Sequence, residues 1–395
     1  MHHSGGRRCA FTIVEILVSV VVLVLIMVMV GQLMNGAAVG TTLSGKHVDA
    51  DSQARMVFDR MAVDFSHMPQ QKDVDFIFSK QPDPSAITTS GSSDKMFFYS
   101  EAPAYFDTSA AGGLYPASTQ PDPKSSVSLI GYAINSGVNN SGGITPPAYC
   151  LQRLSRGLVW DTQNPAVTSP PGAINFLTFP NSNSTTPLPV STLAGNPFTS
   201  GVVGSPPSYD GTDASYDVIG DQVFRMEFCF QVKDLSNPSV PASAYSNYPL
   251  AHFAPGSANQ STESTVAPPA PAVGDRWYDK VNNRAFICTG SNSQGTTMLP
   301  VWKPNGMADV CAIVVAIATL DTNSRKVVSS QQLASLSAYL QDPTETELAQ
   351  NPPELMAQLW QATVNNPDFP GETGVPASVA GQVRIYQRFF DLVRN

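Results

Sequence analysis

An apolar stretch near the N-terminus constrains this chain more than any other feature. Residues 11–45 contain one charged residue, Glu15, and within residues 16–30 the one polar side chain is Ser19. A helix needs about 20 apolar residues, each rising about 1.5 Å, to cross a lipid bilayer. The sequence therefore predicts a transmembrane helix over residues 11–34.

The residues before this stretch predict which way it crosses the membrane. Arg7 and Arg8 lie just ahead of it, with no acidic residue around them. Basic residues hold a short flanking segment on the cytoplasmic side. We therefore expect a single-pass inner-membrane protein with a cytoplasmic N-terminus and with residues 69–395 in the periplasm.

Glu15 is the unusual residue of the apolar stretch. A carboxylate in the hydrocarbon region costs about 2.5–3.5 kcal/mol on insertion scales and is normally functional, with a partner that can be named. An amine is the natural partner. If the chain is cleaved between Ala10 and Phe11, Glu15 becomes the fifth residue of the mature chain, where the α-amino group of a neighbouring subunit can neutralise it.

The residues around this site resemble a known processing signal. Ala10-Phe11-Thr12-Ile13-Val14-Glu15-Ile16-Leu17 is similar to the class III prepilin signal of type IV pilins and of the pseudopilins of type II secretion, which usually has Gly where this chain has Ala10. The resemblance implies that a prepilin peptidase removes residues 1–10 as a leader and methylates the new amine of Phe11. It implies that Glu15 guides docking into a filament and that the partners are other pilin or pseudopilin subunits. We therefore expect a structural subunit, with no cofactor, no metal ion and no catalytic residue.

Two other interpretations of the N-terminus remain open. A cleavable secretory signal has a shorter apolar core, and Gly36-Ala37-Ala38 offers a small-residue cleavage site for it. The length of the apolar run and the presence of Glu15 argue against that interpretation. A signal anchor that is never processed explains the hydrophobicity equally well, but it frees no amine to meet Glu15.

A second, amphipathic helical stretch is predicted over residues 46–68. Its apolar residues recur mostly at steps of three and four, as on one face of a helix: Ala50, Ala54, Val57, Phe58, Met61, Phe65 and Met68. The other face carries charged residues that we expect to be solvated: Asp49, Asp51, Arg55, Asp59, Arg60 and Asp64. No proline precedes Pro69, so residues 35–68 are predicted to continue the stem and to pack their apolar stripe on the following domain.

Four glycines lie where the two helical stretches join. Gly31, Gly36, Gly40 and Gly45 each cost about 1 kcal/mol relative to alanine in a helix interior. They predict a bend or a locally melted join. The alternative is an unbroken helix, which resembles the stem of a pilin.

After Pro69 the sequence changes to short β-type runs between clusters of Pro, Gly, Ser and Asn. Strands are predicted over residues 95–99, 126–134, 149–154, 158–161, 222–232, 284–289 and 310–319, and helices over residues 330–340 and 345–363. Residues 168–216 and 236–273 hold few periodic apolar residues and are predicted to be loop insertions. The predicted fold class is α+β, with a long N-terminal helix, half transmembrane and half amphipathic, packed on a β-rich, loop-rich globular domain.

Resemblances in the globular domain extend this prediction. The alternating run at 222–232, then Trp302, then the apolar run at 310–319 is similar in order to the J-type minor pseudopilins of type II secretion, as is the helical run at 55–65. Residues 151–158 and 383–390 resemble pilin-like proteins called Verru_Chthon cassette protein C. These resemblances imply a domain of pilin type and a minor subunit of a type IV pilus or a type II secretion-like filament.

The net charge, the histidines and the acidic turns limit which other functions the chain can have. The net charge of -9, without a cluster of Lys and Arg, argues against a nucleic-acid partner. His47, His67 and His252 lie far apart, and no hydrolase, zinc-protease or nucleotide-binding motif occurs. Acidic turns at 210–213 and 321–323 have oxygens at a calcium-like spacing, although turn formation explains them better.

The cysteines leave two states open. Beyond Cys9 in the leader, the chain has Cys150, Cys229, Cys288 and Cys311. These four can form two disulfides in the oxidising periplasm, whereas Cys229 and Cys311 lie in apolar runs that suit buried thiols.

The aromatic residues between 273 and 302 predict a hairpin. Their side chains form either a local core or a surface for a glycan or a protein partner. The second option is the basis of an alternative function, a membrane-anchored periplasmic or cell-surface binding module that does not polymerise. An exported enzyme whose site has no recognisable motif is a third hypothesis.

Overall fold

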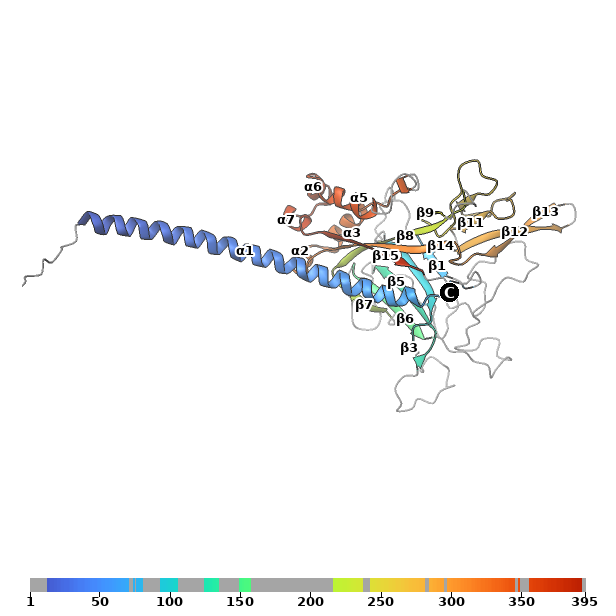
Figure 1. Cartoon of the computed structure of the whole chain (residues 1–395), viewed down its shortest axis with the longest axis horizontal. Helices are drawn as coiled ribbons and strands as arrows, with labels where there is room; N and C mark the ends of the chain where they lie inside the picture. Colours follow the sequence, from blue (N-terminus) through green and yellow to red (C-terminus); the bar gives the residue numbers. More distant parts are fainter. Residues whose placement is uncertain are drawn as a thin grey trace, which may run out of the picture. The chain divides into compact units, whose positions relative to one another are not determined.

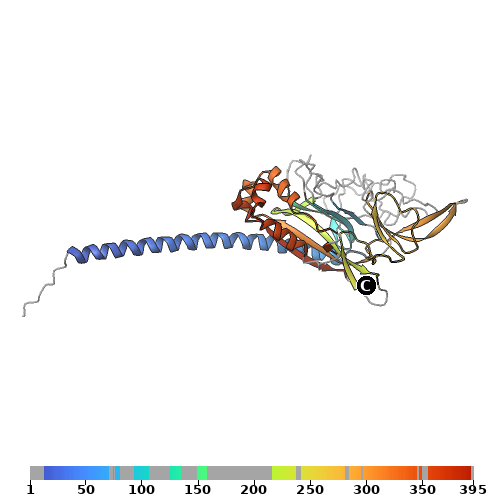
Figure 2. The ribbon, with the colours of Figure 1, turned by 90° about the horizontal axis from the view of Figure 1, so that it is seen from above.

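The computed structural model describes residues 13–70, 74, 76–80, 93–105, 124–134, 149–157, 216–236, 242–280, 284–294, 297–344, 347–348 and 355–392. The chain divides into two compact units, Met1–Asp51 and Ser52–Asn395. Figures 1 and 2 show the elements of each unit.

The N-terminal helix α1 (Ile13–Ser66) runs without interruption through all four glycines. The predicted bend or melted join is therefore wrong, and the alternative of an unbroken helix is the observed one. The glycines are spaced four or five residues apart and no proline lies among them. Each glycine therefore lowers helix propensity without removing a backbone hydrogen bond, and the helix continues.

In the first unit, α1 is apolar on all sides. The described large apolar side chains from Ile13 to Met34 each expose at least 47% of their surface. Residues Ile13–Ala37 form a segment that is long and apolar enough to cross a membrane. A helix that is hydrophobic all round is expected in a protein interior or in a membrane, not in water.

In the second unit, the end of α1 is amphipathic. The predicted apolar stripe is confirmed here, because Ala54, Val57, Phe58, Met61, Phe65 and Met68 are all buried. Asp59 and Arg60 are exposed, as expected for the polar face. Asp64 is the exception, since its side chain is completely buried, and the prediction of a solvated residue is wrong for it.

The described strands of the second unit form three sheets and a small ribbon. An antiparallel sheet has the order β1-β2-β5-β6-β7, with β1 (Phe76–Ser79), β2 (Lys95–Ser100), β5 (Ser128–Ile134), β6 (Leu151–Gly157) and β7 (Tyr216–Gly220). A second antiparallel sheet has the order β15-β14-β8-β9, with β15 (Arg384–Asp391), β14 (Val310–Thr319), β8 (Val223–Asp234) and β9 (Ala242–Ser246). The third has the order β10-β11-β12-β13, with β10 (Ser261–Ser264), β11 (Arg276–Asp279), β12 (Arg284–Gln294) and β13 (Thr297–Pro304). The ribbon pairs β3 (Ala104–Tyr105) with β4 (Lys124–Ser125).

Apart from the end of α1, the described helices of the second unit follow β14 in the sequence. They are α2 (Thr322–Val327), α3 (Ser330–Tyr339), α5 (Leu355–Val364), α6 (Phe369–Thr373) and α7 (Ala377–Ala380). Both ribbon views place α3, α5, α6 and α7 together at the end of this unit away from the β12–β13 hairpin (Figures 1 and 2). The α+β fold class is therefore observed, with an apolar N-terminal helix followed by a β-rich region.

Strand β14 lies at the centre of the second sheet and of the main core. Its sequence is an almost continuous apolar run, which is typical of a strand covered on both faces. It pairs with β8 on one side and with β15 on the other. The predicted strand over residues 310–319 has the observed bounds, because nothing in that run competes with an extended, fully buried conformation.

Several predicted elements differ from the observed ones. The tract 236–273, predicted to be a loop insertion, contains β9 and β10. Strands β1, β7, β11 and β13 are not among the predicted strands, and α5 begins at Leu355 rather than at 345. The predicted strand at 158–161 and nearly all of the tract 168–216 lie outside the described residues.

Candidate functional site

The predicted processing residues precede the described part of the chain. Arg7, Arg8, Ala10 and Phe11 lie outside the described residues, so cleavage and methylation stay predictions. Glu15 is described, in the first turn of α1, and its side chain is exposed. Its backbone carbonyl accepts a hydrogen bond of 2.7 Å from Ser19 Oγ, so Glu15 and Ser19 lie on one side of the helix, one turn apart.

A buried ion pair holds the end of α1 to the first sheet. Arg153 on β6 donates two hydrogen bonds to the Asp64 carboxylate, of 2.5 Å from Nε and 2.9 Å from Nη2. The Tyr132 hydroxyl on β5 donates to the same carboxylate. All three side chains are buried. Two parallel bonds from a guanidinium fix both distance and orientation, so this contact sets the angle at which the helix end meets the sheet.

Charges in this site shift two pKa values. Burial, together with the negative charge of Asp64, raises the pKa of the Tyr132 hydroxyl well above its ordinary value. Burial opposes the charged form of Arg153, but the hydrogen bonds and charge of Asp64 outweigh it and raise the pKa of the guanidinium. The tyrosine therefore stays a hydrogen-bond donor and the arginine stays a cation over the ordinary pH range.

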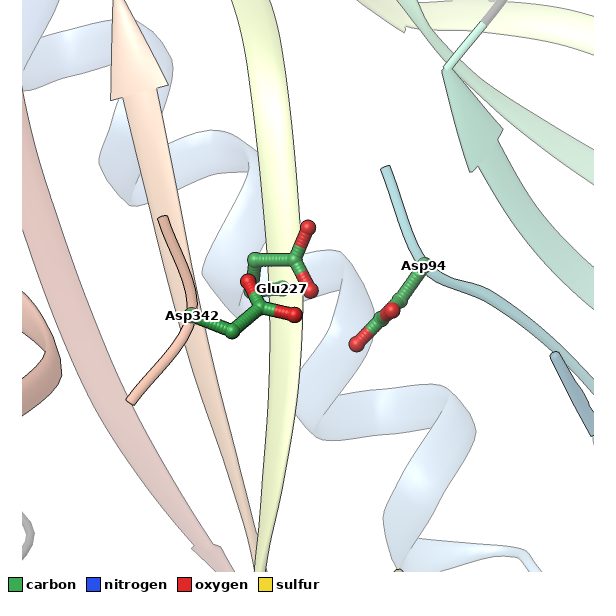
Figure 3. Close-up of side chains that lie close together, drawn as sticks. All are labelled: Asp94, Glu227 and Asp342. Atoms are coloured by element: carbon green, nitrogen blue, oxygen red, sulfur yellow. The ribbon is translucent and has the colours of Figure 1, made fainter. Parts of the chain in front are cut away.

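A second buried network joins segments far apart in the sequence. Figure 3 shows the carboxylates of Asp94, Glu227 and Asp342 facing one another from three separate segments. Asp94 directly precedes β2, Glu227 lies on β8, and Asp342 follows α3. Their oxygens lie within 4.8 Å of one another, which is close enough to hold a metal ion.

The ammonium of Lys80, just after β1, lies where such an ion would bind. Lys80 Nζ is 2.9 Å from Asp342 Oδ2, 3.0 Å from Asp94 Oδ2 and 3.3 Å from Glu227 Oε2. Arg225 adds a second cation, with Nη2 2.7 Å from Glu227 Oε1 and 3.0 Å from Asp342 Oδ1. A divalent ion would have to displace the lysine. The arrangement therefore acts as an internal ion-pair network that connects the first and second sheets to the segment after α3.

The pKa shifts in this network follow from burial and from the charges around each group. Burial raises the pKa of Glu227 well above 4.5, against the attraction of Arg225. Burial also opposes ionisation of Asp342, but Lys80 and Arg225 outweigh it and lower the pKa of that carboxyl. For Lys80, three carboxylates outweigh the burial that favours its neutral form, and its pKa is raised well above 10.5.

The four described cysteines hold thiols rather than disulfides. The alternative of two disulfides is therefore not the observed state. Cys150, Cys229 and Cys288 are buried, whereas Cys311 is partly exposed. Burial raises the pKa of the Cys150 thiol to about 11, which makes it a poor nucleophile.

The structure also describes some of the acidic-turn residues and histidines that the sequence analysis considered. Asp321 caps α2, its side chain accepting from the backbone amides of Asn323 and Ser324 at 3.1 and 3.3 Å. The acidic turn at 210–213 and the side chain of His47 lie outside the described residues. His67 is exposed, and its Nδ1 is 2.7 Å from the carbonyl of Val63.

The aromatic hairpin forms its own small core. Trp277, Phe286 and Trp302 expose 3%, 2% and 8% of their surfaces. The Trp277 ring stacks on Phe286 at 5.3 Å between centroids and tilts against Trp302 at 5.5 Å. These side chains are in contact with one another, so they do not offer the partner surface that the alternative function requires.

Comparisons with known proteins assign no relationship. No protein-family model, no curated protein and no solved structure matches this chain. Its function has to follow from its own residues and their geometry.

The two buried networks were missed by sequence reasoning. A signal for one of them exists, because Arg225 and Glu227 are charged residues among the apolar residues of the first, buried part of β8. A charge in a buried part of a strand needs a partner of opposite charge. The sequence around Asp64 gives no comparable indication, because its neighbours on the helix are solvated charges. Asp64 is buried because β5 and β6 pack against it.

Proposed function

We propose that this chain is a pilin-like structural subunit, a pseudopilin. It is anchored in the inner membrane by the first part of α1, cleaved between Ala10 and Phe11 by a prepilin peptidase, and assembled through the same helix into a type IV pilus or a type II secretion-like filament, as a minor subunit. The observation that carries the proposal is an acidic residue, Glu15, in the first turn of a strongly apolar helix that has no other charged side chain over Ile13–Ala37.

Physical chemistry restricts what such a helix can do. Its exposed apolar surface has to be covered by lipid or by other helices. The carboxylate of Glu15 in those surroundings is stabilised most by a cation at the same depth. A freed α-amino group on Phe11 of a neighbouring subunit, shifted along the helix axis by one turn, meets that requirement. Contact between the two then sets the axial step from one subunit to the next.

The second unit supports a structural role rather than a catalytic one. Its main buried charges, around Asp64 and Lys80, are satisfied by one another. The described thiols are largely buried, and Cys150 is not ionised near neutral pH. The extensive apolar core and the ion-pair networks suit a rigid body carried by a helix.

Mass spectrometry of the native protein tests the processing step. We expect a mature chain that begins with N-methylated Phe11. A mature chain that begins at Met1, or near Val39, contradicts the proposal. The first result would indicate an unprocessed anchor, and the second a cleavable secretory signal.

Replacement of Glu15 tests the assembly step. Glu15→Gln removes the charge at nearly constant size, so the subunit should still insert into the membrane and be cleaved, while crosslinking between subunits falls at least tenfold. Ser19→Ala, one turn along the same helix, is the matched control and should assemble normally. If Glu15→Gln crosslinks as well as the wild type does, the chain is a membrane-anchored module that does not polymerise through this residue.

A further inference from the structure

A hollow lies on the second unit, between the segment after β9 and strand β10. Its volume is about 410 Å³. The side chains that matter most for its chemistry are His252, Phe253, Asn259, Gln260 and Glu263. Pockets for small ligands typically have volumes of about 300–1,000 Å³, so one or two sugar-sized units fit.

The walls of this hollow are held in place although most of them have no regular secondary structure. The His252 amide donates to the Lys233 carbonyl and the His252 carbonyl accepts from the Leu235 amide, both at 2.9 Å. On the other wall, the Gln260 amide donates to Asp275 Oδ1 at 2.9 Å. Asn259 Nδ2 donates to the Val273 carbonyl at 2.8 Å. The hollow is therefore formed before a ligand arrives, which reduces the ordering cost of binding.

The polar groups of the hollow favour a ligand with several hydroxyls. His252 Nδ1 lies 3.2 Å from the Asp234 carboxylate. A carboxylate accepts, so Nδ1 carries the hydrogen, and Nε2 is the ring nitrogen that can bond to a ligand hydroxyl. Gln260 brings an amide that both donates and accepts, and Glu263 brings a carboxylate that accepts. Hydroxyl groups match this mixture because each one both donates and accepts.

The same set disfavours anionic ligands. The lining residues include no lysine or arginine, and two nearby cations are already paired: Lys280 Nζ lies 3.5 Å from Glu263 Oε2, and Arg276 Nε lies 2.6 Å from Asp309 Oδ2. A phosphate or carboxylate ligand would therefore meet no cationic side chain in the lining. The apolar lining includes Leu250, Pro255 and Phe253, whose partly buried ring has the Arg276 guanidinium carbon 6.0 Å from its centroid.

We propose that this hollow binds a neutral saccharide. One apolar C–H face of the sugar packs on the Phe253 ring, and its hydroxyls bond to Gln260, Glu263 and His252. The site is separate from the N-terminal helix, so it does not depend on filament assembly. Such a site would let a subunit contact a surface polysaccharide through its second unit.

Calorimetric titration of the full chain tests the site. The protein is kept in a detergent without a sugar headgroup, such as lauryldimethylamine oxide, and is titrated with cello-oligosaccharides, with chito-oligosaccharides and with inorganic phosphate. We expect one of the neutral oligosaccharide series to bind and phosphate not to bind. Binding of phosphate alone, or no binding by either series, overturns the proposal.

Variants locate the binding. Phe253→Ala and Gln260→Ala should each weaken the affinity at least tenfold. Phe389→Ala removes an exposed ring on β15, outside the hollow, and should leave the affinity unchanged. Unchanged tryptophan fluorescence confirms that each variant is folded. If both hollow variants bind as the wild type does, the sugar binds elsewhere and the assignment fails. Glu15→Gln should keep full affinity, which separates this test from that of the proposed function.

Discussion

The two ends of α1 are one continuous helix with opposite relations to their surroundings. Over Ile13–Ala37 the helix is apolar all round and its side chains are exposed. From Ala54 onward it is amphipathic and buries one stripe in the core of its own chain. The difference teaches that helix formation and helix burial are separate matters, because the first end has to find its apolar partners in a membrane or in other subunits.

Each end of the helix also carries an acidic residue that needs a partner of opposite charge: Glu15 at the first end and Asp64 at the second. Asp64 is buried, and the chain itself supplies its counter-charge through Arg153. For Glu15 we propose a counter-charge from the amine of another subunit. The same chemical requirement is thus met within the fold at one end and by assembly at the other.

The comparison is tested most strongly by removing a large apolar side chain from each end. Phe65→Ala should lower the free energy of unfolding by about 3–5 kcal/mol, because it leaves a cavity among Phe98, Tyr132 and Phe390. Leu25→Ala, a truncation in the exposed end, should leave it unchanged. Denaturant unfolding of the detergent-solubilised chain measures both, since Trp277, Trp302 and Trp360 report on the second unit. An equal loss in both variants would abolish the distinction between the two ends.

Breaking the buried ion pair sharpens the comparison of the two acids. Arg153→Met should cost about 3–5 kcal/mol of unfolding free energy, because it leaves the Asp64 carboxylate buried without its guanidinium. The double variant with Asp64→Asn should recover part of that loss, since a neutral amide is less costly to bury. The same denaturation experiment gives the coupling energy. Strictly additive losses would show that the pair does not act as a unit.

The Lys80 network should make stability depend on pH. The pKa of Glu227 is raised by burial, so its contribution to stability is complete at low pH and is lost as the pH rises above 4.5 through the raised value. Glu227→Gln stays neutral. Relative to the wild type, its unfolding free energy should therefore rise with pH, by up to about 1.4 kcal/mol per pH unit.

A carboxylate with the opposite shift is the control for that experiment. Hydrogen bonds from the amide and hydroxyl of Thr344 lower the pKa of Glu347, so its contribution is present at neutral pH and is lost as the pH falls. Glu347→Gln should therefore differ from the wild type most at neutral pH and least in acid. Parallel pH profiles for the Glu227 and Glu347 variants would contradict the assignment for Glu227.

The smallest effect is expected at the solvent-accessible ion pair between the same helix end and β15. Arg388 Nη1 lies 2.6 Å from Asp59 Oδ1, and the two side chains are 41% and 61% exposed. Asp59→Asn should change the unfolding free energy by about 0–1 kcal/mol, because solvent screens such a pair. A loss as large as that of Arg153→Met would mean that burial does not distinguish Asp59 from Asp64.

Much of the secondary structure follows from the sequence alone. The apolar run at 310–319 and the stripe from Ala54 to Met68 form the predicted elements, because a long periodic or continuous apolar pattern has few alternatives. A short strand such as β1 escapes prediction, since four residues carry too little pattern to distinguish a strand from a loop. The strands within 236–273 escape for the same reason, because polar residues at a sheet edge look like a loop.

The sequence by itself determined the N-terminal part of this protein: an apolar helix, the acid within it, and the basic residues ahead of it are local features that need no tertiary contact to be recognised. The buried networks around Asp64 and Lys80, and the hollow beside His252, were decided only by the tertiary structure. The reason is physical. Whether a charged side chain is solvated or buried depends on which distant strand lies over it, and no local pattern of residues carries that information.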